Sequence, residues 1–292
     1  MILGFGVFSV YAQDDLMKEL EESGEPEIDY AFQTFKGTRL VNGHTIEQKA
    51  KGTLEFIFAH RFGRVNSGLY ELYGLDDAYV RLGLDYGLTN NMSVSIGRNS
   101  VDKTLDGYLK YKLFRQSKGA KVFPVSITAL GGVAYKASPE KEFVPEGFGN
   151  IDRLAYVTQL LIARKFGPDF SLQIAPTFIH KNAVDQRIES NDQMAVGFGG
   201  RYKLTKSVAL TGEYYYRLNV QDTADGNPNP YYNTAGIGID IETGGHVFQI
   251  VLTNSRGLTE RAFIAETEGD LGAGDIHLGF NVTRTFQLRH EK

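Results

Sequence analysis

"GIGIDIETGGHVFQIVLTNS", residues 236–255, consists of two halves in which apolar residues alternate with small or polar ones. In its first half Ile237, Ile239 and Ile241 alternate with small or polar residues, and the second half repeats this alternation. A period of two predicts a strand with one apolar and one polar face, and the Thr-Gly-Gly between the halves predicts a tight turn. The stretch is therefore a predicted β-hairpin, and the fold depends on whether its apolar face meets a protein core or a lipid bilayer.

The composition excludes several classes of protein. The formal net charge of the 292 residues is −4, so we expect no nucleic-acid partner, which would require a clustered basic excess. No run approaches the roughly 18 consecutive apolar residues of a transmembrane helix. The chain has no cysteine, which excludes disulfides, thiolate catalysis and cysteine-based metal sites. Phosphate-binding and dinucleotide-binding motifs are absent as well, so we expect no cofactor.

The N-terminus predicts export. Residues 1–12, "MILGFGVFSVYA", are apolar and end in the small-residue pattern of a cleavage site, so we interpret them as the remnant of a signal peptide. A buried N-terminal strand is the alternative. Residues 13–49 are mixed and polar, and we expect a periplasmic segment that either contains a short helix, within "DDLMKELEESGEPE", or plugs the interior of the following domain.

From residue 50 the pattern predicts a single domain, 50–288, of about twelve strands. Short connections such as "LTNN" (88–91) and "FGPD" (166–169) alternate with long ones such as 256–273. This alternation is typical of a membrane barrel with short periplasmic turns and long extracellular loops. An even number of strands then places both termini in the periplasm. The expected strands are 50–60, 77–88, 92–99, 104–114, 122–136, 154–166, 170–180, 192–204, 207–218, 233–242, 246–255 and 274–286.

Strand length and aromatic placement favour lipid over a protein core. The strands have the ten or so residues that a tilted span requires, whereas a soluble sandwich would show the same alternation without sorting its loops by length. Closure leaves no strand edge unpaired in hydrocarbon. We therefore predict an all-β fold, a closed antiparallel transmembrane β-barrel in outer-membrane lipid. Tyrosines typical of interfacial girdles recur near the predicted strand ends: Tyr79, Tyr86, Tyr135, Tyr156, Tyr202 and Tyr216.

Several segments carry a family resemblance. "FKGTRLVNGHTIE" (35–47), "GTLEFIFAHRFG" (52–63), "GLDDAYVRLGLDYGLTNNMSVSIGRNS" (74–100) and "TLDGYLKYKLFRQ" (104–116) resemble a Bacteroidota outer-membrane β-barrel family that is catalogued as a domain of unknown function. The first block is the most specific of them. The resemblance covers the chain from about residue 30 to its end, and it implies an outer-membrane barrel from a Gram-negative bacterium of that phylum. It implies no substrate, reaction or catalytic residue.

The polar faces of the strands supply the candidate site. Lumen-facing charges select permeating ions and solutes in some barrels, and in others they pair with one another in a structural network. Many other inward positions are small, which leaves room for water, for a solute or for an inserted segment, either 13–49 or 137–153. The predicted lumen-lining residues are Arg81, Asp85, Lys110, Lys112, Arg201, Lys203, Glu213, Asp240 and His277.

Other chemistry has weak support. A barrel hydrolase needs a serine beside an oriented histidine, and none of the six histidines stands in such a pair on one strand face. Residues 222–229 offer oxygen ligands for calcium but lack the spacing of an EF-hand loop, so we favour a turn. The loop 256–273 predicts a short amphipathic helix that contacts a partner or folds over the mouth. We expect no catalytic residue and no metal site.

The predicted function is porin-like, passive passage of small hydrophilic solutes through a polar lumen. The main alternative is a non-conducting, plugged barrel that serves as a structural or accessory subunit and contacts other envelope proteins. An outer-membrane hydrolase is the third alternative. The sequence does not identify the solute, the oligomeric state or the partner proteins.

Overall fold

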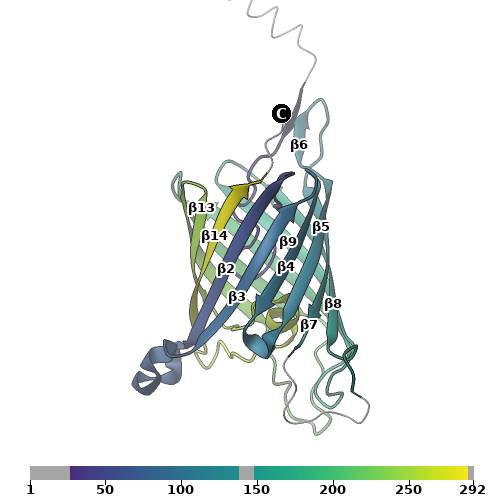
Figure 1. Ribbon diagram of the computed structural model, residues 1–292, viewed down its shortest axis with the longest axis vertical. Coiled ribbons are helices and arrows are strands. Elements are labelled where there is room, and N and C mark those ends of the chain that lie inside the picture. Colours follow the sequence, from purple (N-terminus) through teal and green to yellow (C-terminus); the bar gives the residue numbers. More distant parts are fainter. Residues whose placement is uncertain (1–26, 138–147, 289–292) are drawn as a thin grey trace, which may run out of the picture.

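The computed structural model describes residues 27–137 and 148–288. Twelve strands form one closed antiparallel barrel, in which consecutive strands pair and β14 (His277–Gln287) closes on β2 (Thr53–Arg64) (Figure 1). The fold-class prediction is confirmed, and each of the twelve expected strands is present. Between these two lie β3 (Ala78–Gly87), β4 (Met92–Asn99), β5 (Leu105–Phe114), β7 (Ser126–Tyr135), β8 (Leu154–Lys165), β9 (Phe170–Lys181), β10 (Asp192–Lys203), β11 (Val208–Arg217), β12 (Thr234–Thr243) and β13 (His246–Thr253).

The hairpin predicted for residues 236–255 consists of β12 and β13, paired from Gly236↔Thr253 to Thr243↔His246. Gly244 and Gly245 form its turn with φ of 47° and 88°. Two consecutive positive φ values are typical of the tight hairpin turn whose twist matches the strands, and glycine adopts them without steric cost.

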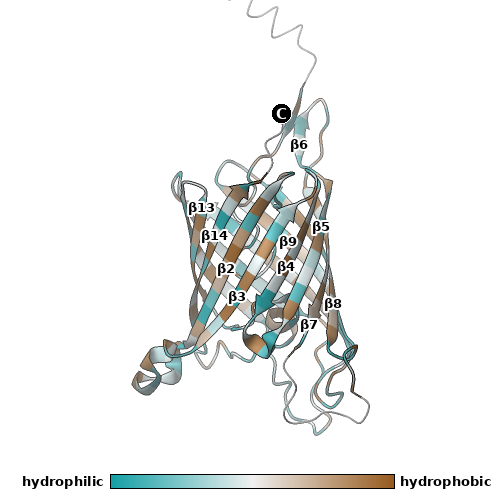
Figure 2. Ribbon diagram, viewed as in Figure 1, coloured by the Kyte–Doolittle hydropathy of each residue, from teal (hydrophilic) through white to brown (hydrophobic). Residues whose placement is uncertain are grey.

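The apolar faces of the strands point outward. Ile237 and Ile239 are 58% and 43% exposed. Asp240, which lies on the opposite, inner face of the same strand, is 3% exposed. A soluble protein has the opposite distribution, so the exposed apolar band is the lipid-facing surface of a transmembrane barrel. Figure 2 shows the resulting alternation of hydrophobic and hydrophilic residues along the strands. Within the described ranges, no helix has the length and apolar character needed to cross a bilayer.

The two ends of the barrel differ. One, here called the turn end, carries the short connections 88–91, 166–169, 204–207 and 244–245, and both ends of the described chain emerge there (Figure 1). The other, the loop end, carries the long connections, one of which contains the short helices η1 (Val65–Ser67) and η2 (Leu69–Gly74), and a single short connection, 100–104, which contains η3 (Val101–Lys103). The expected sorting of connections by length is therefore present.

A small second sheet projects from the turn end. It pairs β1 (Ile28–Tyr30) with β6 (Ser117–Gly119), which lies in the connection between β5 and β7 (Figure 1). The sequence does not predict this sheet, because strands of three residues carry no measurable period. The predicted signal peptide, 1–12, and all but the last residue of the predicted short helix lie outside the described residues.

Two segments fold into the barrel. Residues 34–48, here called the plug hairpin, enter from the turn end, reverse at residues 40–43 and return to the same end, where β2 begins. Its legs are held by an Arg39↔His44 bridge and a bond from Leu40 N to Gly43 O of 2.9 Å. Residues 254–269, here called the inserted loop, enter from the loop end and contain the π-helical turn η4 (Arg261–Ala265).

Candidate functional site

The tip of the plug hairpin is bound by a single carboxylate. Glu213, on the inner face of β11, accepts hydrogen bonds from the backbone N–H groups of Val41 (3.2 Å), Asn42 (2.8 Å) and Gly43 (2.9 Å). Consecutive N–H groups that converge in this way form an anion-binding concavity, and bonds to a charged acceptor are stronger than neutral ones. A Cβ at Gly43 would overlap the ring of Tyr215, so the tip requires glycine there.

The carbonyl groups of the tip are bound by three other strands on the same side of the barrel as β11. Arg61 on β2 donates to Val41 O (2.9 Å) and to the Asn42 side-chain oxygen (2.8 Å). Asn281 on β14 donates to the same Val41 O (3.0 Å), and Gln249 on β13 donates to Leu40 O (2.8 Å). Donors from three strands thus replace the water that these buried carbonyls would otherwise bind.

The legs of the hairpin are bound in the same manner. Lys110 on β5 donates to three backbone carbonyls, those of Thr38, Thr45 and Glu47, at 3.1–3.3 Å. Gln173 on β9 accepts from Ile46 N at 2.9 Å and donates to His44 O at 2.7 Å. The barrel wall therefore holds the hairpin mainly through its main chain.

A smaller part of the contact is apolar. Phe35, Leu40 and Ile46 of the plug hairpin pack in one buried cluster with Leu161, Ala163 and Ala175 of the wall. A Cβ at Gly199 would overlap the side chain of Leu40, and one at Gly236 would crowd Val41. The small inward residues therefore make room for the hairpin.

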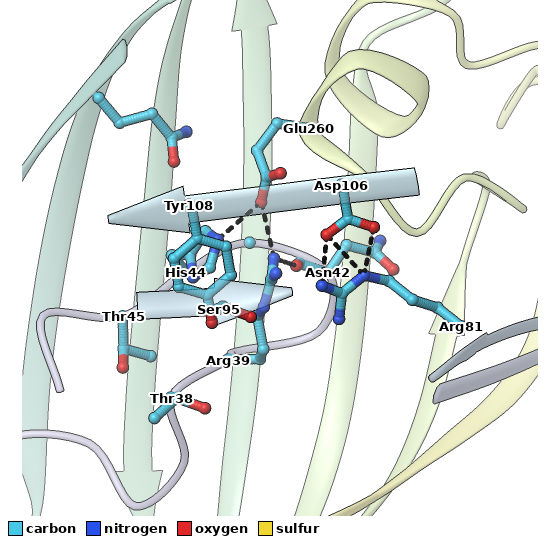
Figure 3. A network of polar contacts seen from close by, with 12 residues as sticks. Thr38, Arg39, Asn42, His44, Thr45, Arg81, Ser95, Asp106, Tyr108 and Glu260 are labelled. Atoms are coloured by element: carbon cyan, nitrogen blue, oxygen red, sulfur yellow. Dashed lines mark hydrogen bonds and ion pairs between the residues drawn. The ribbon is translucent and has the colours of Figure 1, made fainter. Parts of the chain in front are cut away.

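The plug hairpin and the inserted loop meet at Glu260 (Figure 3). A carboxylate oxygen of Glu260 lies 2.7 Å from Arg39 Nη1 and 3.0 Å from His44 Nε2. All three side chains are buried. Burial alone would raise the pKa of Glu260, but Arg39 and His44 outweigh it and hold that pKa well below its ordinary value. Burial, together with the charges of Arg39 and Lys110, lowers the pKa of His44 well below 6.5.

The inserted loop fills part of the lumen from the loop end. Phe263, Ile264 and Ala265 are fully buried, and the Phe263 ring lies edge-on to Tyr215 at 5.2 Å. On its outer side Glu266 accepts from Lys181 on β9 at 3.0 Å. The expectation that this loop folds over the mouth is confirmed, and it extends further into the lumen than expected.

The predicted lumen-lining residues divide into three groups. Glu213 and Lys110 bind the plug hairpin, as described above. A second group bonds within the wall: Arg81 with Asp106 (2.5 Å), Asp85 with Ser95 and Tyr108, Asp240 with Gln249 (2.8 Å) and His277 with Phe62 O (2.8 Å). The third group lies nearest the turn end. It consists of Arg201, which is buried, and of Lys112 and Lys203, which are half-buried.

Other residues that bind the hairpin were not predicted. Arg61, Gln173, Gln249 and Asn281 are single polar residues on strands, and no motif distinguishes them from the rest of the inner face. Glu260 lies in a long loop whose path into the lumen has no sequence signature. One sequence signal did point to the hairpin. The block 35–47 is the most specific segment of the family resemblance, and it makes up most of the plug hairpin.

No group of metal-ligating side chains is assembled by the described residues. In the ranges 27–137 and 148–288, no three His, Asp or Glu side chains converge in a way that suits a metal ion. The candidate calcium loop forms a turn, in which Thr223 N donates to Asn227 O at 2.9 Å and Gly226 has a φ of 76°. His180 pairs with Asp192 at 2.6 Å near the loop end.

Together, the lipid-facing surface, the closed sheet and the occupied lumen define a transmembrane β-barrel whose interior is plugged. The chain belongs to the family described as membrane bound beta barrel domain (DUF5777), whose model matches residues 35–286. The match starts within the plug hairpin, so the hairpin is part of the family's domain. The expected resemblance to a family of unknown function is confirmed; origin in Bacteroidota remains a prediction. No curated protein matches the chain significantly.

Solved barrels resemble this one at low identity. The NanC porin is 11% identical with a TM-score of 0.49, and the alignment covers 80% of this chain and 100% of that one. The KdgM porin is 9% identical with a TM-score of 0.48, covering 80% and 99%. An outer-membrane channel from Pseudomonas putida F1 is 12% identical with a TM-score of 0.48, covering 82% and 97%.

Proposed function

We propose that the chain is an outer-membrane, porin-like barrel through which small hydrophilic solutes pass passively when the plug hairpin leaves the lumen. The observation that carries this proposal is the chemistry of the hairpin's binding surface. Glu213, Arg61 and Lys110 bind mainly backbone groups of the hairpin, and water can replace the hairpin at each of them. Once vacated, the same side chains would line an aqueous path and select solutes by size and local charge.

The topology in this proposal follows the expected one. The turn end faces the periplasm with both termini, and the long loops face outward. Residues 1–12 direct export and residues 13–33 precede the hairpin in the periplasm. Since both legs of the hairpin reach the turn end, it can withdraw through that mouth without threading any part of the chain through the barrel.

Single-channel recording in planar bilayers tests the proposal. The full chain should show low conductance with brief openings, and a variant that lacks residues 34–48 should show large, stable steps that scale with salt. Removal of residues 222–229, an exposed part of a loop-end connection, is the matched deletion and should leave the conductance of the full chain unchanged. Folding of each variant is checked by the heat-dependent gel mobility typical of barrels.

The second candidate is a non-conducting barrel that serves as an accessory subunit of an envelope complex. The observation in its favour is that chain segments occupy the lumen from both ends, with Glu260 joining the plug hairpin to the inserted loop. If the folded variant without residues 34–48 is silent, passage through this barrel is refuted and the accessory role is favoured. In both cases we infer a barrel without catalytic activity, because its buried lumen carboxylates and amines are engaged in structural contacts.

A further inference from the structure

A second polar site lies at the rim of the turn end, outside the lumen network. It is an open pocket of about 380 Å³ between the second sheet and the end of β5. Its lining includes Tyr30, Lys112, Phe114, Arg115, Lys121 and Phe123. The rings of Phe114 and Phe123 are stacked at 4.8 Å, and the guanidinium of Arg115 lies 4.3 Å from the ring centre of Tyr30. Aromatic contacts thus hold the pocket's walls in place.

The pocket carries an unbalanced positive charge. Lys112, Arg115 and Lys121 line it together, and none of its lining residues is acidic. Within the described ranges, none of these three cations forms an ion pair. Other lysines at the turn end do, since Lys36 pairs with Glu242 and Lys49 pairs with Glu55 at 2.6 Å. Three clustered cations that form no ion pair among the described residues favour an anionic ligand.

The position of the pocket indicates where that anion comes from. Leu113 and Phe114, which line it, are 44% and 50% exposed on the outer face of β5. Phe114 also belongs to a girdle of exposed aromatic residues at the turn end, which marks the membrane interface. The other members of this girdle are Phe166, Phe170, Tyr202 and Phe286. The pocket therefore opens at the depth of the lipid headgroups.

We propose that this pocket binds the phosphate headgroup of an anionic phospholipid from the leaflet that meets the turn end. Arg115 has the planar, multiple-donor geometry that suits phosphate, and Lys112 and Lys121 add charge. The acyl chains of the lipid then lie along Leu113 and Phe114. The binding energy combines headgroup electrostatics with apolar contact, as in other basic pockets at the membrane interface.

The absence of tryptophan from the sequence makes a direct test available. Phe114→Trp places one fluorophore in the pocket, and Phe166→Trp places one in the same aromatic girdle away from it. Each full-length variant is reconstituted in phosphatidylcholine vesicles that contain brominated phosphatidylglycerol or brominated phosphatidylcholine. Quenching by the anionic lipid should exceed quenching by the neutral one at position 114 only. Equal quenching by the two lipids at position 114 overturns the proposal.

Removal of single charges distinguishes binding of the lipid in this pocket from general attraction of anionic lipid to the basic residues of the turn end. In the Phe114→Trp background, Lys121→Gln and Arg115→Gln should each reduce the preference for the anionic lipid by roughly fivefold. Lys206→Gln, which removes an exposed charge in another turn-end connection, should leave it unchanged. A preference that survives both pocket variants overturns the proposal. So does a preference that millimolar inorganic phosphate abolishes, because the pocket would then bind a soluble phosphate.

Discussion

At the scale of single residues, Glu213 and Gly43 together hold the tip of the plug hairpin in place. The carboxylate accepts three consecutive N–H groups only because the chain turns sharply at residues 40–43, and the turn fits beneath Tyr215 only because residue 43 lacks a side chain. From the sequence, Glu213 was predicted to line the lumen, either as a charge that selects solutes or as a member of a network of paired charges. The structure shows that its partners are backbone groups, which no sequence pattern reveals.

Replacing Glu213 with Gln should loosen the plug hairpin. The variant loses the charge in three hydrogen bonds, which we expect to cost about 2 kcal/mol of hairpin binding, or about a thirtyfold change in the released fraction. Because the chain has no cysteine, Val41→Cys is a clean reporter, and the rate of its maleimide labelling in folded protein measures release. Glu242→Gln, whose partner Lys36 lies at the mouth, should change the rate less than fivefold. Equal rates in the two variants would contradict the role of Glu213.

His44 should make release of the plug hairpin depend on pH. Its pKa is lowered in the lumen by burial and by Arg39 and Lys110, whereas it returns to about 6.5 when the hairpin is released into water. The released state therefore binds the extra proton, and below pH 6.5 each unit of pH should favour release by up to tenfold. Glu260, with its lowered pKa, acts in the same direction only below about pH 4.5.

Open probability in planar bilayers measures this dependence. Between pH 7.5 and 6.5 it should stay nearly constant, and between pH 6.5 and 5 it should rise in the full chain. His44→Gln keeps a polar side chain that does not titrate, so it should remove the rise in this window. A rise that persists in His44→Gln would assign the effect to other groups.

At the scale of elements, the barrel strands and the closing segments differ in how they are encoded. Each strand has ten or so residues of alternating polarity, because one face meets lipid and the other meets polar partners, and this period is visible locally. The plug hairpin and the inserted loop are buried on every side, so their sequences have no such period. Their places in the lumen depend on contacts between residues more than 100 positions apart, such as Asn42 with Glu213. The strands were therefore predictable, and the contacts inside the lumen were not.

The inserted loop should detach as a unit when its apolar anchor is removed. Phe263 is fully buried against Tyr215, and Phe263→Ala should cost about 3–5 kcal/mol of its docking. The strand ladders do not involve this side chain, so the barrel should remain folded. Limited proteolysis in intact vesicles should then cleave within 254–276 at an increased rate. Leu271→Ala, an exposed position in the same connection, is the control, and an equal increase there would contradict the anchoring role.

At the scale of the whole molecule, the barrel has a polar interior and an apolar surface. This arrangement makes the cost of a surface charge depend on depth in the bilayer. Ile239 lies at the middle of β12 on the outer face, and Ile239→Lys should destabilise the folded barrel by about 2–4 kcal/mol. Leu204→Lys, at the turn end, should cost less than about 1 kcal/mol. Urea titrations in phospholipid vesicles measure both values, and equal costs would contradict the assigned membrane depth.

The return of the plug hairpin to its own entrance has a mechanical consequence. A pull on residues 27–33 along the barrel axis loads the pairing of β1 with β6 and then the first leg, so the contacts would break in sequence and not all at once. Within the barrel, the ion pair of Lys36 with Glu242 breaks first. The bonds of Lys110 to Thr38 and of Glu260 to Arg39 break next. The hydrogen bonds of Glu213 to the tip break last. Stepwise rupture needs far less peak force than simultaneous shear, and it leaves the twelve-strand ladder unloaded. The plug hairpin can thus be drawn out of the lumen by traction on one end of the chain while the wall that spans the membrane stays whole.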